Sequence, residues 1–262
     1  MSDSLPTDRA SVSDLLEAAV RVWRVTLPRC LPLAMIAILC IQLANIYWLS
    51  RGYPEPALTL PSDGTYRVLM VAGSLVYLWL ISALVLRQRA LIAGGTVALP
   101  QELLQALRRQ PVLLATLLLA VLVIVVAAVA IGEPLVKLLG TSLGIGLVVL
   151  ALLFPLVYCL VIVPVVMFEG RGPLDSARRC VRLVHPLWWK SCAAMVIGWL
   201  VIIICSLVLA ALLSLAAMLA GGGQENSFRA VVTAVQVGAS AIVVVFFSAL
   251  WLVLYSAASS SA

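Results

Sequence analysis

The sequence predicts an all-α, polytopic membrane protein, and three observations support this fold class. Of the 262 residues, 64% are hydrophobic and 11% are charged, and the mean hydropathy is +1.16. Soluble domains carry about 25% charged residues, so a soluble core does not explain this composition. Several apolar runs reach the roughly 20 residues that cross the hydrocarbon layer of a bilayer. Short segments with arginines and helical periodicity lie between these runs.

One membrane domain is expected over residues 11–255, between a disordered segment at 1–10 and a polar tail at 256–262. Its six predicted transmembrane helices lie at about 31–49, 68–86, 112–131, 143–168, 191–219 and 231–255. Pro155 and Pro164 lie inside the fourth span and are expected to kink it. The first 30 residues are polar and amphipathic, so no cleavable signal peptide is predicted.

Three amphipathic surface helices are expected, each just before a span that leads outward. The first covers 11–27, where Ser11 and Asp14 are spaced as a capping box. The second covers 100–110, ahead of a tight connection that holds Glu133 and Lys137 and joins the third and fourth spans. The third lies within 169–190.

The segment 169–190 is the most charged part of the second half of the chain. Gly172 and Pro173 break the preceding span, since proline suits a first helical position, and Pro186 ends the new helix. The predicted apolar face of this helix is Leu174, Ala177, Val181 and Val184. Asp175 and Arg179 are expected to form an i,i+4 pair on its other side. Trp188, Trp189 and Lys190 are typical of an interfacial anchor.

The distribution of basic residues predicts the orientation. With a cytoplasmic N-terminus, the inner segments hold 13 of the 17 Lys and Arg residues, and only Arg51, Arg67, Lys137 and Arg229 lie outside. Basic residues concentrate on the cytoplasmic side of membrane proteins, so both termini are expected there.

A three-fold internal repeat is one interpretation of the surface helices. Asp14, Glu102 and Asp175 each precede an arginine by seven residues, namely Arg21, Arg109 and Arg182. A proline follows in each case, at Pro28, Pro111 and Pro186. The alternative is convergence, because the helix dipole alone favours early acids and late arginines.

No catalytic residue, metal site or cofactor is predicted. Every Asp, Glu, Lys and Arg residue falls outside the spans or at their edges, and His185 is the only histidine. The six cysteines form no C-x-x-C pair, and the chain has no phosphate-binding Gly-x-x-x-x-Gly-Lys loop. Because the arginines flank apolar spans, a surface of anionic lipid is a better partner for them than nucleic acid.

Polar residues within the spans leave two interpretations open. They are Gln42, Asn45, Ser74, Ser82, Thr233, Gln236 and Ser240. Such residues commonly form hydrogen bonds between helices. They would line the path of a polar substrate if the chain were a small transporter or permease-like subunit, in which Pro155 and Pro164 would mark a broken helix at the binding site.

The basic residues of the surface helices are the candidate lipid head-group ligands. They are Arg21, Arg24, Arg108, Arg109, Arg178, Arg179, Arg182 and Lys190. The same residues serve as topology anchors in any inner-membrane protein. Near an anionic surface each contributes about 1 kcal/mol of attraction.

Two segments carry a resemblance to a known family. The opening SVSDLLEAAVRVWRVTLPRCLPLAMIAIL and the later VVMFEGRGPLDSARRCVRLVHPLWWKSCAAMVIGWL resemble bacterial six-span proteins related to the glycerophosphoryl diester phosphodiesterase membrane domain. The resemblance implies a bacterial inner-membrane protein. Some relatives carry a catalytic barrel after the membrane domain, and no such barrel follows within these 262 residues. The resemblance therefore implies no phosphodiesterase activity here.

The resulting expectation is a non-enzymatic membrane protein that associates with phospholipid or supports an envelope protein partner. The alternative is the small transporter or permease-like subunit.

Overall fold

The computed structural model describes residues 11–51, 63–95, 98–140, 155–219 and 225–260, and every element described is a helix. The predicted all-α class is therefore confirmed. The predicted disorder at 1–10, most of the first outer loop and the first part of the fourth span lie outside the described residues.

Five helical stretches are long and apolar enough to cross a membrane, as in a multi-pass membrane protein. They are Val12–Trp48, Gly64–Ile92, Leu99–Ala130, Pro173–Val208 and Val235–Ser259. A sixth apolar stretch, Pro155–Glu169, is shorter. At 1.5 Å per residue this described part extends about 22 Å, and residues 143–154 of the predicted fourth span lie outside the described residues. The prediction of six spans is therefore supported for five of them.

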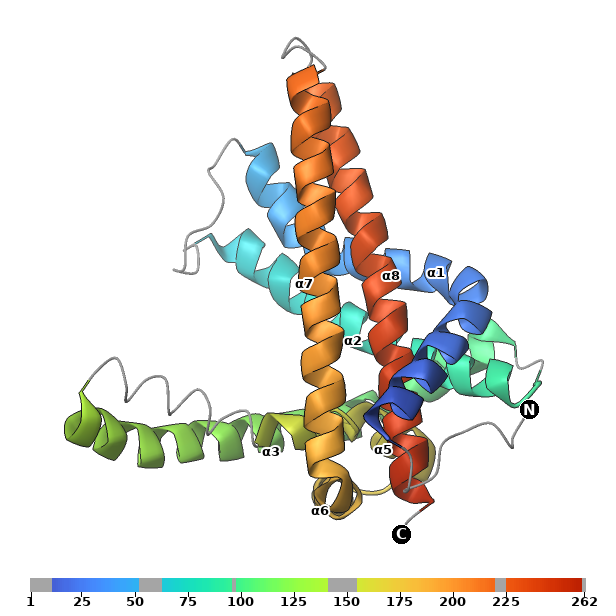
Figure 1. Ribbon diagram of the computed structural model, residues 1–262, viewed down its shortest axis with the longest axis vertical. Coiled ribbons are helices and arrows are strands. Elements are labelled where there is room, and N and C mark those ends of the chain that lie inside the picture. Colours follow the sequence, from blue (N-terminus) through green and yellow to red (C-terminus); the bar gives the residue numbers. More distant parts are fainter. Residues whose placement is uncertain (1–10, 52–62, 96–97, 141–154, 220–224, 261–262) are drawn as a thin grey trace.

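The first predicted surface helix and the first span form one continuous helix, α1 (Val12–Ser50). The capping box is confirmed, because the Ser11 amide donates to Asp14 Oδ2 at 2.8 Å and the Asp14 amide donates to Ser11 Oγ at 3.2 Å. Pro28 and Pro32 lie inside α1, and its path bends in Figure 1. Separate helices were expected here; membrane helices tolerate interior prolines when neighbouring groups satisfy the freed backbone.

Helix α3 (Leu99–Leu139) corrects the expectation in the same way. It joins the predicted surface helix at 100–110 to the third span through Pro111, and it continues through the expected tight connection and Pro134. Helix α2 (Gly64–Ile92) contains the second predicted span, and Asp63 caps it by accepting hydrogen bonds from the Thr65 and Tyr66 amides.

The fourth predicted span is interrupted. A short helical stretch at 155–159 ends in a turn, and α5 (Ile162–Glu169) begins after it. The break falls at residues 160–161, just before Pro164. Proline lacks an amide hydrogen and its ring crowds the carbonyl four residues earlier, here that of Leu160. The fourth span was expected to kink at its prolines, and its break lies just before Pro164.

The second half of the chain contains α6 (Pro173–Val184), a 3-10 turn (His185–Leu187), α7 (Trp188–Leu219) and α8 (Glu225–Ser259). Helix α8 continues four residues into the predicted polar tail, where Ala257 and Ala258 are buried. The tail was therefore placed too early.

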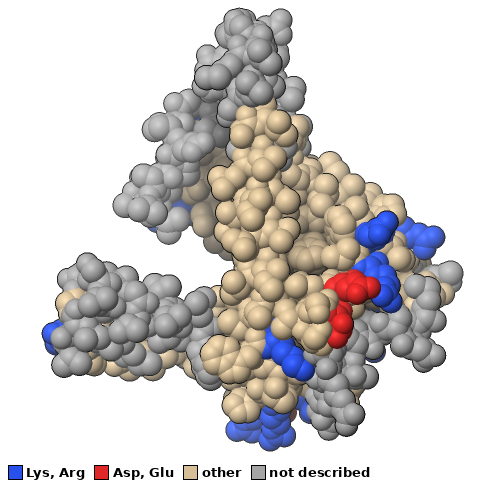
Figure 2. Space-filling model, in the orientation of Figure 1, with Lys and Arg blue, Asp and Glu red and all other residues tan. Residues whose placement is uncertain are grey.

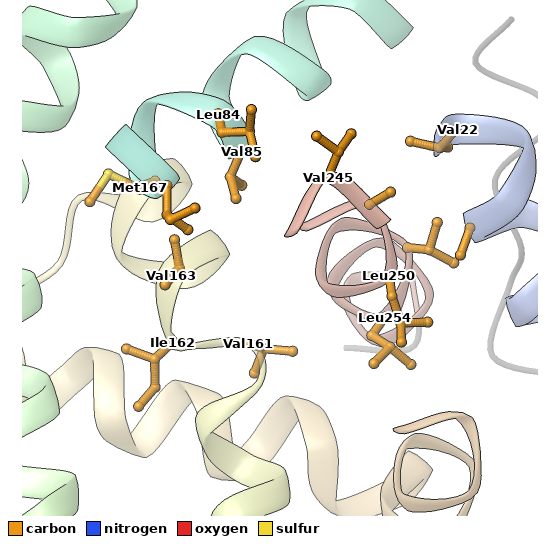
Figure 3. Close-up of a cluster of buried hydrophobic side chains, with 14 of the residues drawn as sticks. Val22, Leu84, Val85, Val161, Ile162, Val163, Met167, Val245, Leu250 and Leu254 are labelled. Atoms are coloured by element: carbon orange, nitrogen blue, oxygen red, sulfur yellow. The ribbon is translucent and has the colours of Figure 1, made fainter. Parts of the chain in front are cut away.

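The core lies where α1, α2, α5 and α8 meet. Figure 3 shows Val22 of α1, Leu84 and Val85 of α2, residues 161–163 and Met167 around α5, and Val245, Leu250 and Leu254 of α8 converging. Helix α1 packs chiefly on α2 and α8.

Helices α3 and α7 extend beyond this core. Figure 1 shows α3 leading sideways from the foot of the upright α7–α8 pair, so the described helices do not form a bundle of aligned spans. Residues of α3 such as Leu118, Val121 and Val129, and of α7 such as Leu200 and Leu207, are exposed. Such extended apolar faces are those that a bilayer covers.

Candidate functional site: a basic surface around helix α6

The local sequence separates α6 from α5, as predicted. Gly170 ends α5 in the left-handed region, with φ of +64°, which glycine adopts without steric cost. Gly172 is extended and Pro173 takes the first helical turn of α6. At the other end, α6 gives way at His185 to a 3-10 turn that contains Pro186, and α7 follows at Trp188.

The buried face of α6 shares only Val184 with the predicted apolar face. Its buried residues are Ser176, Cys180, Leu183 and Val184, and this face packs on α3, α5 and α8. Leu174 and Val181, also on the predicted apolar face, are 53% and 47% exposed. Both stripes have helical spacing, and the periodicity alone did not show which one faces the protein.

The exposed side of α6 therefore carries apolar and basic residues together. Arg178 and Arg182 are exposed on the same helix as Leu174 and Val181. Trp189 follows at the start of α7 and is 78% exposed, whereas Lys190 is half-buried. In Figure 2, Lys and Arg side chains lie at the foot of the molecule and along its right side, where acidic side chains lie among them, while the described part of α7 above is uncharged.

Arg179 forms a different contact from the one predicted. Its Nε donates to Glu169 Oε1 at 3.3 Å, so it pairs with the end of α5 rather than with Asp175. The Tyr255 hydroxyl of α8 donates to the same oxygen at 3.3 Å. Arg171 Nε lies 2.7 Å from Glu169 Oε2. Glu169 is only 13% exposed, so the carboxylate joins the α5–α6 connection to α6 and α8.

Arg109 of α3 reaches the same connection. Its Nη1 donates to the carbonyls of Val166 and Met167, in the last turn of α5. The partial negative charge of a helix C-terminus favours a cation there. A Cβ added at Gly170 would lie 3.2 Å from Arg109 Nη2, so glycine also leaves room for this guanidinium.

Arg89, in the last turn of α2, completes the group. Its guanidinium carbon lies 4.2 Å from the centre of the Phe168 ring, within the range of a cation–π interaction. We call Arg89, Arg109, Arg171 and Arg179 the arginine cluster. Only Arg109 and Arg179 were among the predicted head-group ligands.

The remaining candidates lie apart from this cluster. Arg21 pairs with Glu17 on the exposed surface of α1, at 3.1 Å, and Arg24 is exposed on the same helix. Arg108 is exposed on α3, one residue before the half-buried Arg109. Each therefore presents its charge outward but none takes part in the contacts around Glu169.

A second ion pair was not predicted. Arg87 Nη1 donates to Glu102 Oε2 at 3.1 Å, and the Glu102 side chain is only 4% exposed. Arg87 Nε also donates to the Arg29 carbonyl, so the pair joins α1, α2 and α3. The only sequence signal was an acid in the first turn of a surface helix just after a span ending in arginines.

The polar residues considered for a transport path mostly bond locally. Asn45 Nδ2 donates to Gln42 Oε1 at 2.8 Å, and the Tyr66 hydroxyl donates to Asn45 Oδ1 at 3.3 Å. Ser74 and Ser82 each donate to a carbonyl of their own helix. Gln236 is exposed and Ser240 is half-buried on α8, and the Thr233 side chain lies outside the described part.

Two buried glutamines were not considered. Gln88 is fully buried and donates to the Val245 carbonyl at 3.0 Å, and Gln110 donates to the Leu75 carbonyl at 3.3 Å. Both lie next to arginines at the ends of predicted helices, and no pattern in the sequence indicated their burial.

Comparison of the chain with protein-family models, curated protein sequences and solved structures finds no match. The resemblance to the six-span family therefore stays a prediction that depends on the two quoted segments.

Proposed function

We propose that this chain is a non-enzymatic, multi-pass protein of a bacterial inner membrane that binds anionic phospholipid head groups on its cytoplasmic side and so organises lipid or an envelope partner. Both termini are cytoplasmic in this proposal, six spans cross the membrane and α6 lies in the interface. The proposal does not require the three-fold repeat, because Arg21, Arg109 and Arg182 have different surroundings.

The observation that carries the proposal is the exposed side of α6. A helix lying in a membrane interface places apolar side chains among the acyl chains and basic side chains among the head groups. Leu174 and Val181 supply the apolar residues, Arg178 and Arg182 supply the charge, and Trp189 has the amphipathic ring common at interfaces.

The transporter alternative has less support. The hydrogen bond between Gln42 and Asn45, and that between Asn45 and Tyr66, hold α1 to itself and to α2. These contacts favour packing over a solvent-lined path.

The test compares lipid retention by the native protein and by the double variant Arg178→Glu/Arg182→Glu, using native mass spectrometry from nanodiscs that contain phosphatidylglycerol. Two basic residues at about 1 kcal/mol each correspond to about a thirtyfold loss of affinity. Arg179 is left unchanged because it pairs with Glu169.

Arg51→Glu is the matched control, since it reverses a charge at the end of α1 on the predicted outer side. It should retain lipid like the native protein. Equal retention by all three proteins would show that Arg178 and Arg182 are topology anchors and nothing more.

A further inference from the structure

Positive charge exceeds negative charge around the α5–α6 connection. The four guanidinium groups of the arginine cluster contact residues 166–169, and Glu169 supplies the carboxylate in these contacts. Arg109 is engaged by two carbonyls and Arg89 by the Phe168 ring. Arg171 and Arg179 therefore depend on Glu169 for an anionic partner.

Glu169 satisfies these two arginines incompletely. Arg171 Nε lies 2.7 Å from Oε2, yet this buried oxygen has no well-aligned hydrogen bond among the described residues. Arg179 reaches Oε1 at 3.3 Å, and Tyr255 shares that oxygen. A planar carboxylate offers two oxygens in one plane, whereas a phosphate group offers several in a tetrahedron and is a frequent bidentate partner of arginine.

The site is also open to a ligand on one side. Arg171 is 51% exposed, and Arg179 is 24% exposed. Both flank the first turn of α6, the helix whose outer side carries Arg178 and Arg182. A head group held by those exposed arginines would have its phosphate near the edge of the cluster.

We infer that Arg171 and Arg179 form a phosphate-group site, and that the Glu169 carboxylate occupies it as an internal competitor until a phosphate displaces it. This inference rests on the proposed function, since it names the place on the basic surface where one lipid phosphate binds specifically. The ligand chemistry is an anionic phosphate group, supplied by a phospholipid head group or by free phosphate.

The decisive variant is Glu169→Gln in the full chain. The amide oxygen can still accept from Tyr255, but the competing charge is gone. Phosphatidylglycerol should be retained about fivefold more tightly than by the native protein, the change expected when one partly exposed ion pair no longer opposes binding. Removing any acidic side chain near the site also reduces the general repulsion of anionic lipid. A control variant with the same change in net charge is therefore needed.

Asp175→Asn is that control, because Asp175 is exposed in the first turn of α6 and its loss changes the net charge equally. It should raise retention much less than Glu169→Gln. If lipid retention rises equally in the two variants, or does not rise in Glu169→Gln, the inference that Glu169 competes with phosphate is refuted.

Arg171→Gln gives an independent readout that a folding defect does not obscure, since Arg171 is half exposed. It should lower phosphatidylglycerol retention in both the native and the Glu169→Gln background, and unchanged retention would overturn the site. Inorganic phosphate at millimolar concentration identifies the source. Displacement of the lipid indicates a general phosphate site, and persistence of the lipid indicates head-group binding.

The two proposals fail separately. Loss of lipid in Arg178→Glu/Arg182→Glu with no response to Glu169→Gln would leave the proposed function and remove this site. Tighter lipid retention in Glu169→Gln with unchanged retention in Arg178→Glu/Arg182→Glu would support the site at Arg171 and Arg179. It would also contradict lipid binding by the exposed Arg178 and Arg182.

Discussion

At the scale of single residues, Gly73 sets how closely α1 and α2 approach. A Cβ at this position would lie 2.3 Å from the Cys40 carbonyl oxygen, which is backbone and cannot rotate away. Small residues allow this close approach of helices in membranes, where packing and weak Cα–H···O contacts replace the hydrophobic effect. The contact between α1 and α2, one of the largest in the molecule, thus depends on a hydrogen atom as a side chain.

Gly73→Ala is therefore expected to destabilise the protein by about 1–3 kcal/mol, the usual cost of overpacking, and to lower the thermal midpoint in mild detergent. Gly198→Ala is the control, because a Cβ there would make ordinary contacts of 3.6 Å and more with Phe246, Phe247 and Leu250. It should leave the midpoint unchanged or raise it, since alanine favours helix. Equal midpoints for both variants would contradict the close crossing.

Predictions for single residues were confirmed where the interacting residues are close in sequence. The capping box of Ser11 and Asp14 spans three residues, and its hydrogen bonds form as predicted. The partner of Arg179 could not be predicted, because Glu169 is ten residues away and Asp175 has the spacing of a helical pair. The burial of Glu102 could likewise not be predicted, since it depends on an ion pair with Arg87 of another helix.

At the scale of elements, Arg109 joins α3 to α5. The same head-group role was predicted for Arg109 and its neighbour Arg108, but of these two only Arg109 donates to the carbonyls of Val166 and Met167. Arg108 is exposed. The difference arises from the rotation of α3, which a pair of adjacent arginines does not reveal.

Arg109→Gln should lower stability by about 1.5–3 kcal/mol, the range for hydrogen bonds to charged groups. Arg108→Gln should change it by less than about 0.5 kcal/mol, as for most surface substitutions. Thermal unfolding of both variants in the same detergent checks this. A similar loss for both would mean that Arg109 does not hold the end of α5.

The prolines show why element boundaries were harder to predict than element type. Each surface helix was expected to stop at a proline, yet α1 and α3 pass through Pro28 and Pro111 without ending. Only α6 is a separate helix, and it has Gly172 and Pro173 at its start and a 3-10 turn at Pro186. Here the helix break coincides with Gly170 in the left-handed region and Pro173 three residues later, whereas a proline alone interrupts a membrane helix less reliably.

At the scale of the whole molecule, four contacts of arginine side chains join different segments of the chain. Arg87 with Glu102, Arg89 with Phe168, Arg109 with the end of α5, and Arg179 with Glu169 all involve segments predicted to be cytoplasmic. The composition of the chain was sufficient to predict a helical membrane protein, but the sideways direction of α3 in Figure 1 has no signal in its periodicity.

The most direct test of head-group binding uses phosphatidylglycerol with a photoreactive group on its head. After irradiation in nanodiscs, labelled peptides are mapped by mass spectrometry. We expect the label within residues 171–190, reduced by Arg178→Glu/Arg182→Glu and by excess unlabelled phosphatidylglycerol. Label that avoids residues 171–190, or that is unchanged by the double variant, would contradict the binding of anionic lipid at helix α6.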